Sequence, residues 1–176
     1  IPKVSYGTTE MTAGIMFLLD SDMEGYDIKL DTVKQESAQG GYFAGALYES
    51  ESSSIVDVKH EVNSMDIMTG GSSFGDVSGS IKNVTSKVGT LKSDTNALYG
   101  VFRNCSGNAE NIQFEANTIE SKHGYAYGFG GYLSASMKDV TSTIQTVKSE
   151  NSNAYGFSES LSGSMSQNIT SQVTTV

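Results

Sequence analysis

The residue types most capable of chemistry gather near the N-terminus, in the acidic run Asp20-Ser21-Asp22-Met23-Glu24-Gly25. Carboxylates at the first, third and fifth positions, a glycine at the sixth and an acid at the twelfth match the spacing of a calcium-binding loop. The twelfth residue is an aspartate instead of the longer bidentate glutamate, and Asp27 stands where such a loop has an aliphatic residue. An ordinary acidic corner of a repeat is therefore the alternative interpretation. The candidate calcium ligands are Asp20, Asp22, Glu24 and Asp31.

The sequence gives little support for a zinc site or for a catalytic serine. His60 and His123 lie at different phases of the repeat described below, with no Cys or second His nearby, so we expect both to be solvated and not zinc ligands. No Gly-x-Ser-x-Gly nucleophile elbow is present. Coils of nearly equal, short length would also leave no room for a cleft built from long loops. The sequence therefore predicts a protein that is not an enzyme. It predicts no cofactor other than the candidate calcium ion.

Hydroxyl side chains suggest one binding alternative. A regular threonine column on a flat face could bind ice, although a second threonine column is missing beside it, and β-propensity explains surface threonine equally well. The column consists of Thr32, Thr90, Thr118, Thr146 and Thr175.

These residues are positioned by an internal repeat. Short phrases of the type Leu-Ser-Gly-Ser-Met recur with a period of about 28 residues, beginning at Val77, Cys105, Leu133 and Leu161. A second series keeps the same period to within one position and runs through most of the chain as Val33, Val62, Leu91, Ile119, Val147 and Val176. A fixed period of this size indicates one supersecondary unit stacked on itself, here about six times.

The repeat unit reads as extended chain. Met137, Val140, Ile144 and Val147 have helix-like spacing, but six of the eleven residues from 137 to 147 are β-branched. Upstream, aromatic and aliphatic residues alternate with Gly and Ser from Tyr127 to Met137, which is the period of a strand. We expect three short strands per coil: one from 127 to 137, a middle one near Val140, and a third that ends at the Thr-Val column.

Three strands and three corners in each repeat predict an all-β fold, a single-stranded β-solenoid or parallel β-helix, with coils ~4.8 Å apart. Residues 1–176 would form one continuous domain, with 1–40 as a divergent N-terminal or capping coil. Identical side chains should then stack in ladders. The predicted ladders are Tyr99, Tyr127 and Tyr155, and Val77, Cys105, Leu133 and Leu161, with the Cys105 thiol buried as a small apolar group.

Charge and hydropathy restrict the partners. The net charge is −9, and Arg103 is the single arginine, so the basic patch that nucleic-acid binding requires is missing. The longest apolar run, from Ile15 to Leu19, is too short to span a bilayer, so we expect no membrane insertion. The chain starts at Ile1 without Met, and we expect a processed chain or a fragment of a longer protein.

In its repeats the chain resembles the passenger regions of bacterial autotransporters and related large surface proteins. The matching residues are Ala126-Tyr127-Gly128-Phe129 and Ala154-Tyr155-Gly156-Phe157, followed by strands such as Asn83-Val84-Thr85 and Asn168-Ile169-Thr170. The resemblance covers roughly residues 70–176. It implies a secreted or cell-surface protein, commonly a stalk or adhesin, and it carries over no catalytic residue.

The expected function is a structural or adhesive scaffold segment whose outer faces meet glycans or proteins of a host or neighbouring cell. The first alternative is an extracellular filament subunit, because exposed strand edges at the ends of a solenoid can pair with other copies. The second is an ice- or calcium-dependent ligand-binding solenoid.

Overall fold

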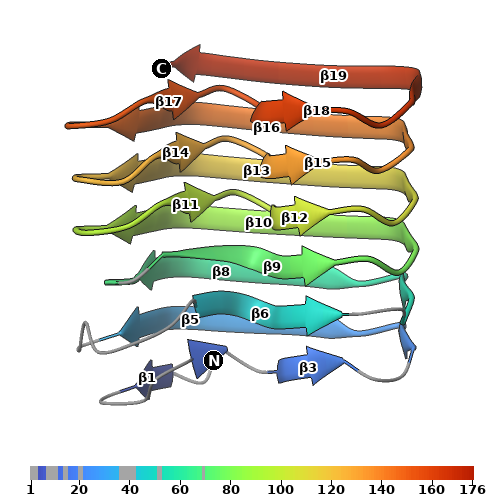
Figure 1. The fold of residues 1–176 in the computed structure, drawn as a ribbon. Coiled ribbons are helices and arrows are strands. Elements are labelled where there is room, and N and C mark those ends of the chain that lie inside the picture. Colours follow the sequence, from blue (N-terminus) through green and yellow to red (C-terminus); the bar gives the residue numbers. More distant parts are fainter. Residues whose placement is uncertain are drawn as a thin grey trace.

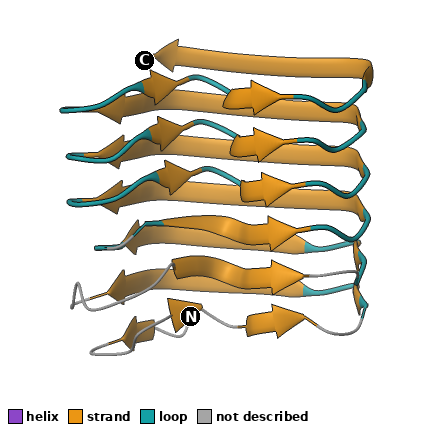
Figure 2. Ribbon diagram, in the orientation of Figure 1, coloured by secondary structure: helices purple, strands orange, loops and turns teal. Residues whose placement is uncertain are grey.

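The structure is a computed structural model that describes residues 4–6, 12–13, 16–19, 22–35, 43–50, 53–68 and 70–176. Every regular element among these residues is a β-strand, and the strands stack in levels from the N-terminal to the C-terminal end (Figure 1; Figure 2). The described part of the chain has no helix long and apolar enough to cross a membrane. The structure confirms the predicted all-β solenoid.

One wall is a nine-stranded sheet, called here the long sheet. Six of its strands repeat once per coil in the order β5-β8-β10-β13-β16-β19. Its members are β1 (Val4–Tyr6), β4 (Met23–Glu24), β5 (Asp27–Gln35), β7 (Ile55–Val56), β8 (Lys59–Asp66), β10 (Ile81–Ser93), β13 (Ala109–Ser121), β16 (Met137–Ser149) and β19 (Met165–Thr175).

The opposite wall is a ten-stranded sheet, called here the short sheet. Its members are β2 (Thr12–Ala13), β3 (Met16–Leu19), β6 (Phe43–Ser50), β9 (Gly71–Val77), β11 (Leu98–Tyr99), β12 (Phe102–Cys105), β14 (Ala126–Tyr127), β15 (Gly130–Leu133), β17 (Ala154–Tyr155) and β18 (Ser158–Leu161).

Pairing between coils is parallel and in register. Ile81 on β10 pairs with Ala109 on β13, which pairs with Met137 on β16, so equivalent positions of these coils are related by the period seen in the sequence. The backbone hydrogen bonds of each coil are therefore made to its neighbours, and a single coil could not satisfy them alone.

Each of the last three coils has three strands, as predicted, but the predicted boundaries of these strands were wrong. The middle and third strands are one 13-residue strand in β10, β13 and β16, and this strand bends at a residue in the left-handed region. Asparagine and aspartate tolerate that conformation better than other side chains. The bend residues, each with φ of 53–54°, are Asp57, Asn83, Asn111, Asp139 and Asn168.

The strand predicted from Tyr127 to Met137 was also too long. The structure divides it into β14 and β15, places a corner at residues 134–136, and begins β16 at Met137. The corners of successive coils pack backbone against backbone, because a Cβ at Gly163 would collide with the carbonyl oxygen of Ala135. Small residues at this place form a corner and not the continuation of a strand.

The second predicted series contains one error of register. Met65 pairs with both Val33 and Leu91, whereas Val62 pairs with Leu30 and Val88. Both Val62 and Met65 are buried, because two successive residues between them, Asn63 and Ser64, face away from the core, so apolar character alone does not distinguish the two alignments. The step from Val33 to Met65 is longer than the step from Met65 to Leu91, and the coils are therefore less equal in length than expected. By the same shift, Ser64 occupies the threonine column beside Thr32 and Thr90.

The core fills the space between the two sheets with stacked side chains. Phe129 and Phe157 stack with their ring centroids 4.8 Å apart, the repeat distance expected of successive strands. Large side chains such as Phe74, Phe102 and Phe114 are fully buried in the same interior. Adjacent coils therefore bury each other's apolar layers.

Candidate functional site

Two of the predicted calcium ligands, Asp22 and Asp31, are bonded to separate partners in the next coil. Asp22 Oδ1 accepts hydrogen bonds from the backbone N–H and the hydroxyl of Ser54, at 2.8 and 2.6 Å. The Ser54 hydroxyl bond, followed by the backbone bond, lowers the pKa of Asp22. Asp31 Oδ1 accepts from Asn63 Nδ2 at 2.9 Å, Glu24 is exposed, and Asp20 lies outside the described residues. In the part of the chain that the structure describes, no three His, Cys, Asp or Glu side chains are placed to hold a metal.

The tyrosine ladder is brought together as a column of parallel rings. Tyr99 stacks on Tyr127 at 4.9 Å with 2° between the planes, and Tyr127 on Tyr155 at 5.1 Å with 10°. The Tyr127 hydroxyl donates to Glu159 Oε2 at 2.7 Å. Burial first, and Glu159 second, raise the pKa of Tyr127. This column (Tyr99, Tyr127 and Tyr155) is called the tyrosine column below.

The second predicted ladder is also one column. Cys105 pairs with Val77 below and with Leu133 above, and Leu133 pairs with Leu161. The thiol is fully buried, as predicted, and burial raises the pKa of Cys105 to about 12. A protonated, inaccessible thiol acts as an apolar packing group.

His60 was expected on an outer face, and the structure places it in the interior. The side chain is 1% exposed and belongs to an inward column in which it pairs with Ile28 and Ser86. Its ring meets Phe74 edge-on at 5.7 Å. The alternation of Val58, His60 and Val62 with Lys59 and Glu61 is a sequence signal for this inward position, but the register error described above moved the second coil by three residues.

His60 belongs to a buried polar chain. His60 Nδ1 lies 3.1 Å from Ser86 Oγ, Ser86 Oγ donates to Ser73 Oγ at 3.0 Å, and Ser73 Oγ donates to the Gly100 carbonyl at 2.9 Å. Nε2 of His60 has no hydrogen-bond partner among the described residues. Burial lowers the pKa of His60 to about 4, so the ring is neutral at pH 7. The chain of contacts has the residue types of a hydrolase but is closed to solvent, so it cannot meet a substrate from solution.

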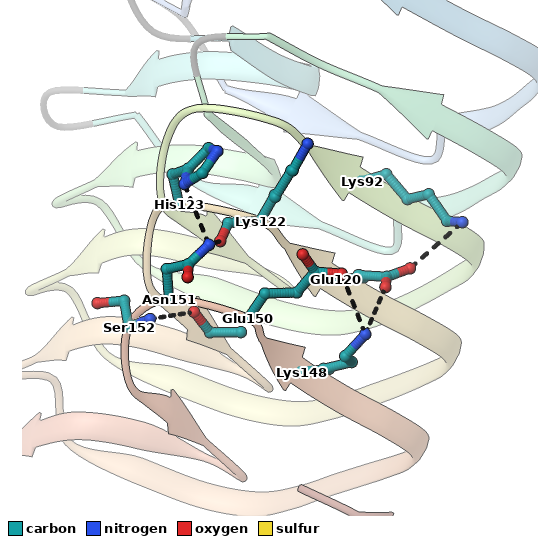
Figure 3. A network of polar contacts seen from close by, with 9 residues as sticks. Lys92, Glu120, Lys122, His123, Lys148, Glu150, Asn151 and Ser152 are labelled. Carbon is teal, nitrogen blue, oxygen red and sulfur yellow. Dashed lines mark hydrogen bonds and ion pairs between the residues drawn. The ribbon is translucent and has the colours of Figure 1, made fainter.

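Solvent-facing chemistry lies on the outer face of the long sheet, where charges alternate along columns. Lys92, Glu120 and Lys148 follow one another in successive coils. Glu120 lies 3.3 Å from the Lys92 ammonium and 3.1 Å from that of Lys148 (Figure 3). The Lys148 hydrogen bond is the largest cause that lowers the pKa of Glu120. Opposite charges on both sides therefore stabilise the ionised carboxylate.

Two further columns repeat the arrangement. Glu110 lies between Lys82 and Lys138, at 3.4 and 3.2 Å, and Lys87 Nζ lies 2.9 Å from Glu115. All these groups are largely exposed, so solvent screens each pair and its contribution to stability is small. Their larger effect is on which coils pair. If a coil paired with the next coil but one, like charges such as Lys82 and Lys138 would face each other.

A shallow groove of about 240 Å³ follows the bend of the long sheet. Its lining includes the amide chain in which Asn111 Nδ2 donates to Asn83 Oδ1 at 2.9 Å and Asn83 Nδ2 to Asp57 Oδ1 at 2.7 Å. Lys59, Thr85 and Gln113 complete the lining. The left-handed backbone at the bend is what turns these amides outward in a row.

A second groove, of about 320 Å³, crosses four coils beside the charged columns and is called the amide groove here. Gly89 leaves a gap in a column of amides between Asn63 and Asn117. Planar amides, carboxylates and an ammonium group thus surround one recess and offer both donors and acceptors. The polar residues around it are Glu61, Asn63, Lys87, Glu115, Asn117, Thr143 and Gln145.

Sequence reasoning missed these outer features, although signals for them exist. Lys82, Glu110 and Lys138 recur at the period of the repeat, and the bend residues recur at nearly the same interval. The grooves themselves have no such signal, because they depend on where the long strand bends.

Comparison with known proteins gives no match to the chain, whether the comparison is with family models, with curated proteins or with solved structures.

Proposed function

We propose that this chain is a structural and adhesive scaffold segment of a secreted or cell-surface protein, with no catalytic role. Two features support the proposal. A stack of parallel coils is a rigid way to present one surface repeatedly along an axis. The Ser and His side chains that could suggest catalysis are enclosed in the core, away from any ligand.

The observation that carries the adhesive part is the amide groove on the outer face of the long sheet. The groove is lined by both planar amides and carboxylates. These side chains lie on successive coils, so they repeat at the spacing of the strands. Hydroxyl-rich ligands are held by such convergent donors and acceptors. We therefore propose that glycans are the partners, bound along the groove across the coils.

A binding assay with a matched control tests this function. Purified chain is incubated with immobilised surface polysaccharides, and the double substitution Asn117→Ala with Gln145→Ala removes two groove amides. Each lost hydrogen bond is worth about 1 kcal/mol, so affinity should fall roughly tenfold or more. Asn108→Ala removes an exposed amide outside the groove and should leave binding unchanged.

Two results would reject the glycan-binding role. One is the absence of binding to any polysaccharide tested. The other is binding that Asn117→Ala with Gln145→Ala and Asn108→Ala weaken to the same extent.

A second function, a filament subunit, is favoured by the edge that β17, β18 and β19 form. These strands are the outermost members of both sheets at the C-terminal end (Figure 1). Leu161 is 47% exposed there and Val176 65%, with Phe157, Ile169 and Val173 only partly buried. If this edge ends the stack in the whole protein, its apolar side chains and unpaired strands can pair with another copy.

Light scattering across a wide concentration range tests this alternative. Growth of the scattering mass with concentration, abolished by Leu161→Lys, would support filament assembly. A monomer at every concentration would reject it.

A further inference from the structure

The tyrosine column places oxidisable phenols in contact across three coils. The rings of Tyr99, Tyr127 and Tyr155 lie face to face, 4.9 and 5.1 Å apart and nearly parallel. Each ring is held in this arrangement by the in-register pairing of β11, β14 and β17. Each phenol ring therefore lies directly against the ring of the next coil.

A fourth tyrosine connects this column with solvent. Tyr125 is 43% exposed, and its ring lies 5.9 Å from Tyr127 and 6.4 Å from Tyr155. A soluble oxidant can therefore take an electron from Tyr125. Tyr127 can then reduce the oxidised Tyr125 by electron transfer across a single ring-to-ring contact.

Tyr127 also has a proton acceptor in place. Its hydroxyl donates to the Glu159 carboxylate at 2.7 Å, while the residue is 2% exposed. A phenol loses an electron more readily when its proton can move to a neighbouring base at the same time. Glu159 can take that proton and, because it is exposed, pass it to solvent.

We propose that the tyrosine column is an oxidative modification site, at which a peroxide, acting through a haem peroxidase, joins successive coils by a dityrosine bond. Two phenols each lose one electron and one proton and become phenoxyl radicals. The radicals couple through ring carbons next to the hydroxyls, forming one carbon–carbon bond, and the hydrogens on those two carbons move to the oxygens as the phenols re-form. The two electrons and two protons reduce one hydrogen peroxide to two water molecules, so the reaction balances.

Tryptic mapping can locate the bond, since cleavage after Lys92, Arg103, Lys122, Lys138 and Lys148 places the three tyrosines in separate peptides. The full chain at low concentration is treated with hydrogen peroxide and a haem peroxidase. We expect blue dityrosine fluorescence in a species that has the monomer mass less two hydrogen atoms. Peptide 123–138 should be joined to 93–103 or to 149–176.

Two phenylalanine variants separate the column from the other tyrosines. Tyr127→Phe keeps the stacked ring but cannot form a phenoxyl radical, so both joined peptides should be lost. Tyr132→Phe removes a tyrosine that is 54% exposed but outside the column, and it should leave the joined peptides unchanged. Should Tyr127→Phe lose its β-type circular dichroism, Tyr155→Phe serves instead, with loss of the bond to 149–176 and retention of the bond to 93–103.

Three outcomes would overturn the inference. They are the absence of dityrosine, cross-links found only between chains, and an equal yield of joined peptides in Tyr127→Phe. The result is independent of the proposed glycan binding, because the tyrosine column belongs to the short sheet and the amide groove to the long sheet.

Discussion

Single residues set the shape of each coil in this protein. Asp57, Asn83, Asn111, Asp139 and Asn168 hold left-handed backbone at equivalent places, which other L-residues adopt at a cost. Their side chains then bond along the stack, as Asn168 Nδ2 does to Asp139 Oδ1 at 2.8 Å. The same asparagine or aspartate thus bends the strand and links the bend to the next coil.

His60 makes stability depend on pH. Its pKa in the folded chain is lowered to about 4, against 6.5 for an unperturbed histidine, because burial disfavours the charged ring. Above pH 6.5 the ring is neutral in both states. As the pH falls from 6.5 towards 4, only the unfolded chain binds the proton, so the free energy of unfolding decreases, by roughly 3 kcal/mol in total.

Urea unfolding between pH 7 and pH 4 measures this effect. His60→Phe should lose the part of the decline that His60 causes, since Phe114 already fits the same inward column. His123→Asn is the control, because its ring is exposed and the decline should persist. Parallel pH profiles for the wild type and His60→Phe would contradict the assignment.

At the scale of the strands, glycine decides how closely two coils approach. Gly100, Gly128 and Gly156 occupy one place in successive coils, after β11, β14 and β17. A Cβ at Gly128 would collide with the carbonyl oxygen of Gly156, whereas a Cβ at Gly156 would meet only valine side chains, the nearest atom being Val173 Cγ2 at 3.3 Å. The carbonyl cannot move without breaking the pairing of the coils, but the valine side chain can adjust.

Gly128→Ala should therefore lower the free energy of unfolding by roughly 1–3 kcal/mol, the range of an overpacked core. Gly156→Ala makes the same chemical change one coil later and should cost no more than about 0.5 kcal/mol. Urea denaturation of the two variants compares them directly. Equal losses would show that the coils are not in the contact described.

The sequence indicated the strands, the period and the tyrosine column, because these depend on side-chain type and spacing alone. It did not indicate that the predicted middle and third strands are one strand in β10, β13 and β16, with a left-handed residue two positions after its start. Without the pairing between coils, Val62 and Met65 were interchangeable, and His60 was assigned to the wrong side of the sheet. The groove at Asn83 and Asn111 was missed because it lies at the left-handed bends, and the amide groove because it lies where the inward and outward alternation of the long strands changes, at Gly89 and its counterparts.

At the scale of the whole molecule, the stack is specified by many weak, repeated interactions. Alternating charges, amide chains, ring stacks and apolar columns all favour the same register between coils. None is large alone, as the exposed Lys87–Glu115 pair illustrates. Together they penalise every displaced pairing, which is how a chain of similar repeats selects one alignment.

Parallel stacking of the coils in register is tested most directly by a pair of spin labels. Lys29, Glu61, Lys87, Glu115, Thr143 and Gln172 form one outward column, with five steps from first to last. At ~4.8 Å per step, labels at 29 and 172 should be ~24 Å apart. Cys105→Val, matching Val77 in the same column, removes the native thiol.

Pulsed electron paramagnetic resonance should give a narrow distance distribution centred near that value for Lys29→Cys with Gln172→Cys. Moving the second label to Thr143→Cys should shorten the distance by one step, ~5 Å. A broad distribution, or a distance that does not shorten when the second label moves down one coil, would contradict the in-register stack.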